Sequence, residues 1–225
     1  MHEPEGYRKL CGLVPTIRNA AAASIYESIG CAVAAGDIKV PAQSGCAAVS
    51  AAKFACPIDT ERIAALSANM PKADGIPVFE AVALKNGKLC FRVSFALLRE
   101  YVHLSLRCFG SGGKAPTVQE RLFLPVNGVM PDEEASGYAM ALLLAYARTG
   151  RETVPCDASR DALLRCLTLP GAAEGSKLRS ALASAVRSAL TACGKGVLGG
   201  EEAGAMALLL GFAAERLNFE RTQRR

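Results

Sequence analysis

The sequence has no tryptophan and only two histidines, His2 and His103, among its 225 residues. A serine or cysteine nucleophile activated by an imidazole would have to use His103, because His2 lies at the chain terminus. His103 follows Tyr101 and Val102 on a predicted helix, so we expect it to be a structural histidine. The histidine content therefore gives no support for catalysis by such a dyad.

A phosphate-binding loop with the spacing GxxxxGK[ST] is also missing from the sequence. The segment GSGGK at residues 110–114 combines glycines with a lysine, but its spacing differs, and Ala115 stands in place of the metal-binding hydroxyl. We interpret this segment as part of a linker. The sequence thus predicts a protein that is not an enzyme and holds no cofactor.

Metal-ligand spacing is absent among the nine cysteines, which show no pair at the two-to-four-residue distance of structural zinc sites. An odd number of cysteines without a secretion signal favours reduced thiols. Cys46 and Cys56, or Cys156 and Cys166, remain pairs that the fold could bring together. We expect no metal site.

Apolar runs are too short for a membrane span, since residues 20–35 and 203–214 fall below the roughly 20 residues that a spanning helix needs. The first residues include Glu3 and Glu5 and no basic leader. These features predict a cytoplasmic protein without a membrane partner. The net charge of +5, with its excess of cations in the first half, permits contact with a polyanion without showing it.

The clearest local signal is a β-hairpin closed by Asn86-Gly87, residues that tolerate the positive φ angles of a type I′ turn. Its strands are predicted at residues 78–85 and 88–94, and Ser94 can cap a helix over residues 95–107. Strand alternation places Lys88, Cys90 and Arg92 on the face opposite Leu89, Phe91 and Val93. That face is our candidate ligand surface.

The remaining pattern predicts an α+β fold in which a small N-terminal α+β domain with an antiparallel hairpin precedes an all-α helical bundle. Helices are expected at residues 16–35, 45–55 and from Asp59 or Thr60 to about 70. Residues 1–109 form the first domain, 110–131 the linker and 132–225 the bundle. The four helices of the bundle are expected at residues 132–149, 157–169, 176–193 and 201–219.

Four charged residues lie close together on the second of those helices, and we interpret Asp157 and Asp161 with Arg160 and Arg165 as surface ion pairs.

The order of short motifs resembles arginyl-tRNA synthetases. Residues 36–107 are similar to their N-terminal additional domain, and the second half is similar to the opening of their DALR-type helical anticodon-binding domain. The matching segments are Val40-Pro41 with Gly45, Ala52-Lys53, Arg62-Ile63-Ala64, Asn86-Gly87, Phe95-Ala96-Leu97-Leu98, Tyr138-Ala139-Met140-Ala141 and Asp161-Ala162-Leu163-Leu164-Arg165. The catalytic domain with its HIGH and KMSK signatures is missing, so the resemblance implies RNA binding without aminoacylation.

Our first hypothesis is therefore a non-catalytic protein that binds tRNA or another structured RNA through phosphates and shape. The candidate RNA-binding residues are Lys39, Lys85, Asn86, Lys88, Arg92 and Lys114. The alternative is a protein-protein interaction module, or a homo-oligomer, that has kept the fold and associates through the helix at residues 203–217.

Overall fold

The computed structural model describes residues 5–110 and 132–223, with side chains placed over 6–109 and 136–217. The helices are α1 (Glu5–Cys11), α2 (Leu13–Ile29), α3 (Thr60–Ala68), α4 (Phe95–Gly110), α5 (Asp132–Ala147), α6 (Asp157–Leu167), α7 (Ser176–Gly194) and α8 (Gly200–Gln223). The strands are β1 (Cys46–Ser50), β2 (Lys72–Ala73), β3 (Ile76–Pro77), β4 (Phe79–Lys85) and β5 (Lys88–Val93). This is the α+β fold that the sequence predicts, with a helical C-terminal region.

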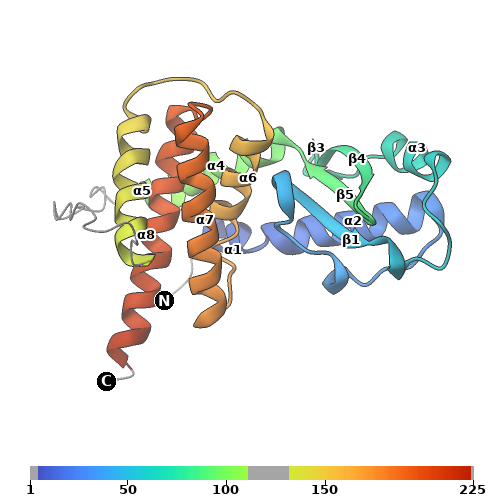
Figure 1. Cartoon of the computed structure of the whole chain (residues 1–225), viewed down its shortest axis with the longest axis horizontal. Helices are drawn as coiled ribbons and strands as arrows, with labels where there is room; N and C mark the ends of the chain where they lie inside the picture. The colour runs from blue at the N-terminus through green and yellow to red at the C-terminus, as the bar shows by residue number, and fades with distance from the viewer. Residues whose placement is uncertain (1–4, 111–131, 224–225) are drawn as a thin grey trace.

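The elements are arranged in two lobes, one built from the sheet with α2 and α3, the other from the long helices of the second half (Figure 1). Helix α4 comes from the first half of the chain but packs against α8 and α6, and α1 packs against α4. The buried side chains of both lobes belong to one continuous hydrophobic core. The predicted linker lies outside the described residues except for Gly110, and the division into two domains stays a prediction.

The main sheet has three antiparallel strands in the order β1-β5-β4, and β2 pairs with β3 in a separate small hairpin. The predicted turn between β4 and β5 is confirmed, because Asn86 has a φ of 49° and Gly87 a φ of 68°. Alternation along β5 is confirmed as well: Leu89, Phe91 and Val93 are buried, whereas Lys88 is exposed. The register thus fixes which side chains face away from the core.

The helix predicted at residues 45–55 is wrong, because this segment forms β1 between two short 3-10 turns, Gln43–Gly45 and Ala51–Lys53. Its alanines favour a helix locally, but β1 gains a full antiparallel ladder with β5 and buries Ala47 and Val49. Helix α2 also ends at Ile29, six residues earlier than predicted, because Gly30 caps it in the left-handed region with a φ of 68°.

All four predicted helices of the second half are present, with ends that differ from the prediction by a few residues. Asp59 caps α3 by accepting a hydrogen bond from the Arg62 backbone N–H at 2.9 Å, as the sequence predicts. The short strand suggested for residues 122–124 lies outside the described residues. No helix in the described part of the chain is long and apolar enough to cross a membrane.

Ser94 caps α4 from a buried position, where its hydroxyl accepts from the Leu97 N–H at 3.1 Å and donates to the Pro77 carbonyl. We expect Ser94→Ala to lower the free energy of unfolding by about 1–2 kcal/mol, because the buried Leu97 N–H and the Pro77 carbonyl both lose their partner. Urea unfolding measures this loss. The control is Ser67→Ala, an exposed serine within α3, for which we expect a change below about 0.5 kcal/mol. Equal effects for the two variants would contradict the capping role.

Candidate functional site

The strand register brings four predicted cations to one face of the three-stranded sheet. Lys88 lies opposite Lys85 on β4, and Arg92 lies opposite Cys46 on β1. Lys39 forms an antiparallel bridge with Ala48, so it extends the sheet beyond β1. Directly opposed residues in antiparallel strands share a face. The open sheet face defined in this way consists of Lys39, Cys46, Ala48, Ser50, Ala81, Ala83, Lys85, Lys88, Cys90 and Arg92. Two of these residues, Cys46 and Ala48 at the β1 edge, are buried.

Three of these cations have no acidic partner within the described part of the chain. Lys39, Lys85 and Lys88 are exposed, and none of them forms an ion pair with a described residue. Opposed like charges destabilise a strand pair, so the pairing of Lys85 with Lys88 costs stability unless an anion binds there. This uncompensated charge marks the hairpin tip as the part of the face best suited to bind an anion.

Cys90 lies beside this charge, in the row between the tip and Arg92. Burial raises the pKa of its thiol, and the neighbouring Lys85 and Lys88 partly oppose that rise. Cys90 is therefore a neutral group at ordinary pH. Cys90 lies between Ala48 and Ala83, and all three side chains are small. The middle of the open sheet face therefore carries no charge.

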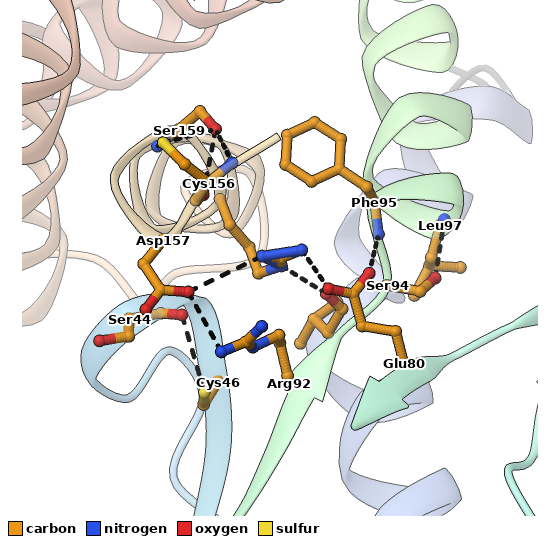
Figure 2. Close-up of polar contacts among 12 residues, drawn as sticks. Ser44, Cys46, Glu80, Arg92, Ser94, Phe95, Leu97, Cys156, Asp157 and Ser159 are labelled. Atoms are coloured by element: carbon orange, nitrogen blue, oxygen red, sulfur yellow. Dashed lines mark hydrogen bonds and ion pairs between the residues drawn. The ribbon is translucent and has the colours of Figure 1, made fainter. Parts of the chain in front are cut away.

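Arg92 differs from the three lysines because α6 covers its end of the face. Its Nη2 lies 3.5 Å from Oδ1 of Asp157, the first residue of α6, and 38% of its side chain is exposed (Figure 2). The sequence-based prediction placed Arg92 and Lys88 on one surface. The two do share a face, and an aspartate of the helical lobe partly neutralises Arg92.

Next to this pair, Arg160 of α6 anchors the two lobes to each other. Only 5% of its side chain is exposed, its Nε donates to the Val93 carbonyl at 2.9 Å, and its Nη2 pairs with Glu80 of β4. Its guanidinium also stacks on the Phe95 ring at 5.1 Å from the centroid. The interpretation of Arg160 as a surface ion-pair residue is therefore wrong.

Asp161 and Arg165, which lie beside and just after Arg160 on α6, make further contacts with the surrounding elements. We call the contacts of Arg160, Asp161 and Arg165 the seam between the two lobes. Arg165 Nε donates to Asp161 Oδ2 at 2.8 Å, and its Nη1 donates to Ser184 of α7 at 2.9 Å. Asp161 also accepts from the Ser188 hydroxyl at 2.7 Å and from the Gly45 N–H at 3.3 Å. These contacts tie α6 to α7 and to the loop that leads into β1.

Comparison of this chain with protein-family models, curated proteins and solved structures finds no significant match. The resemblance to arginyl-tRNA synthetases consequently stays a prediction, and the geometry of the described residues carries the functional argument.

Three further residues were singled out in the sequence: Asn86, Lys114 and His103. Asn86 is exposed and shapes the turn, and Lys114 lies outside the described residues. His103 is half exposed and its Nε2 lies 3.3 Å from Oε2 of Glu201, so it pairs with a carboxylate on α8. Among the described residues, no group of three or more histidine, cysteine, aspartate or glutamate side chains could hold a metal ion.

Sequence reasoning missed the contribution of β1 to this surface and the role of Arg160. The helix predicted at residues 45–55 hid the position of Cys46, Ala48 and Ser50 beside β5. Arg160 carries no burial signal of its own, because an arginine beside aspartates on a helix is typical of a solvated face. The one sequence feature that drew attention to this position was the DALR-like segment that follows it directly.

Proposed function

We propose that this protein is a non-catalytic, arginyl-tRNA-synthetase-like protein that binds structured RNA, with tRNA as its preferred ligand. The observation that carries the proposal is the gathering of Lys39, Lys85 and Lys88 on the open sheet face without acidic partners among the described residues. Lysine ammonium groups contact phosphates as point charges, and such contacts dominate RNA affinity.

The residues between these lysines favour contact with an RNA backbone. Ala83 and Cys90, both half-buried, occupy the middle of the face beside the buried Ala48, and their small side chains leave room for a ribose-phosphate chain to approach the sheet. The open sheet face includes no aromatic side chain on which a base could stack. We therefore expect recognition by charge and shape, with low sequence specificity.

The resemblance adds the preference for tRNA. In arginyl-tRNA synthetases, the corresponding hairpin presents an aromatic and a polar side chain to the elbow of the tRNA. This chain keeps Asn86 at the turn and carries Lys88 and Cys90 on the strand that follows. We infer that the hairpin tip approaches the same region of the RNA through phosphates.

The alternative hypothesis, self-association through residues 203–217, finds less support. This part of α8 packs against α5, α4 and α7, and most of its apolar side chains are buried within the chain. The buried residues are Ala203, Ala205, Met206, Ala207, Leu209, Leu210 and Ala213. An interaction module would need another surface, and no specific observation favours one.

The test is binding of the full chain to total tRNA, measured by fluorescence anisotropy at several salt concentrations. We expect a complex near micromolar protein at low salt. Three lysine-phosphate contacts predict a slope of log affinity against log salt of about −2.7, which is a loss of about 40-fold between 50 and 200 mM salt. The proposal fails if no complex forms at low salt, or if double-stranded DNA of equal charge binds as tightly as tRNA.

A further inference from the structure

Two cysteines that are far apart in sequence meet at the edge of the sheet lobe. The sulfur atoms of Cys31 and Cys56 lie 3.1 Å apart, although 25 residues separate them along the chain. A disulfide bond is about 2.0 Å long, so closing the remaining gap needs a movement of about 1 Å. These are not the pairs that spacing suggested, since Cys46 instead contacts the Ser44 carbonyl at 3.6 Å.

Both cysteines are held by regular structure on either side. Cys31 follows Gly30, whose N–H closes the end of α2 on the Tyr26 carbonyl. Cys56 lies between the 3-10 turn Ala51–Lys53 and the start of α3. Each is partly exposed, so small molecules can reach both thiols while the backbone keeps them together.

We infer that Cys31 and Cys56 form a reversible intramolecular disulfide, and that this pair is a thiol modification site of the protein. In the reaction, the thiolate of one cysteine attacks a low-molecular-weight disulfide such as oxidised glutathione and releases one molecule of reduced thiol. The second cysteine then attacks the mixed disulfide and releases another reduced thiol. The protein loses two protons and two electrons, and the small disulfide gains them.

The surroundings of the pair disfavour the thiolate that starts this exchange, because the hydrogen bond with Cys56, followed by burial, raises the pKa of Cys31 above its usual value. Arg62 of α3 only partly opposes this rise in pKa, and its Nη1 donates to the carbonyl of Pro57, next to Cys56. Exchange should therefore be tested at mildly alkaline pH, where more of the thiol is ionised.

The disulfide closes the segment that contains β1 and Lys39. This segment includes the bridge between Lys39 and Ala48 and the exposed ion pair of Lys53 with Asp37 at 3.2 Å. Closing a loop of this length restricts the unfolded chain. The disulfide thereby stabilises the edge of the sheet that supports the open sheet face.

Tryptic peptide mapping tests the inference directly. The protein is incubated folded with oxidised glutathione, the free thiols are alkylated, and the chain is digested. Cleavage after Arg18, Lys39, Lys53 and Arg62 leaves Cys31 in the peptide 19–39 and Cys56 in the peptide 54–62, each as the sole cysteine. We expect these two peptides to appear linked, with a mass about 2 Da below their sum, and to separate after reduction.

Cys108→Ser is the matched control, because Cys108 is partly exposed but belongs to α4 in the other lobe. This variant should retain the linked peptides, and Cys31→Ser should lose them. Oxidation should also raise the melting temperature of the wild type by roughly 5–10 °C, and that of Cys31→Ser by less than about 2 °C. The inference is overturned if the folded protein leaves both peptides singly alkylated, or if either cysteine links to a different partner.

Discussion

Replacing Arg160 by alanine should destabilise the protein by about 3 kcal/mol. The change takes the Arg160 guanidinium away from the Val93 carbonyl and from Glu80, which keeps only its hydrogen bond from the Phe95 N–H at 3.3 Å, and it removes a side chain that is only 5% exposed. Breaking a buried ion pair by removing one partner costs about 3–5 kcal/mol, and the partial exposure of Glu80 places the effect at the lower end. The measurement is urea unfolding followed by circular dichroism.

Arg179→Ala is the matched control, since Arg179 is an exposed arginine on α7 that forms no ion pair with a described residue, and we expect it to change stability by less than about 0.5 kcal/mol. The double variant of Arg160→Ala with Glu80→Ala should lose less than the sum of the two single losses, because no unpaired carboxylate remains. A loss below about 1 kcal/mol for Arg160→Ala would show that the seam does not depend on this pair.

This seam explains why two lobes share one core. Gly45 packs so tightly on the side chain of Arg160 that an added Cβ would overlap it, and Gly45 has a φ of 68°, where side chains are strained. The loop before β1 therefore approaches α6 only because position 45 is glycine. The DALR-like segment follows Arg160, and its Asp161 and Arg165 make contacts of the same seam. The motif that suggested an RNA-binding family therefore forms structural contacts in this chain.

The hairpin and the helices of the second half could be predicted because their signals are local. Asn86-Gly87 fixes a turn whatever the rest of the chain does, and Ser94 and Asp59 provide caps within three residues. In contrast, β1 depends on pairing with β5, which lies about 40 residues further along the chain, and its alanines favour a helix when read alone.

The candidate site could likewise be predicted only where its signals are local. Lys85 and Lys88 follow from the hairpin register, which the sequence fixes. Lys39 joins them only through its bridge to Ala48 on β1, and the partial neutralisation of Arg92 by Asp157 depends on the docking of α6. Long-range packing therefore decided which of the predicted cations remain available to a ligand.

Reversing both charges at the hairpin tip, with Lys85→Glu and Lys88→Glu together, should weaken tRNA binding by about 30- to 100-fold at low salt. Two of the three unpaired cations on the open sheet face are lost and two anions replace them, so the salt slope should fall by about 2. Stability should change little, because the double variant again places like charges opposite each other. Anisotropy with tRNA and urea unfolding of the same preparations measure both quantities.

A control with the same change in net charge is Lys72→Glu with Arg148→Glu, two exposed cations on β2 and at the end of α5. We expect it to weaken binding by less than about 5-fold, because these residues lie away from the open sheet face. The single variant Lys88→Glu separates folding from binding further: it creates an opposite-charge pair with Lys85, so it should stabilise the hairpin by up to about 0.5 kcal/mol while still weakening the complex. If the control weakens binding as much as the tip variant does, the attraction depends on net charge alone, and the open sheet face is not the binding surface.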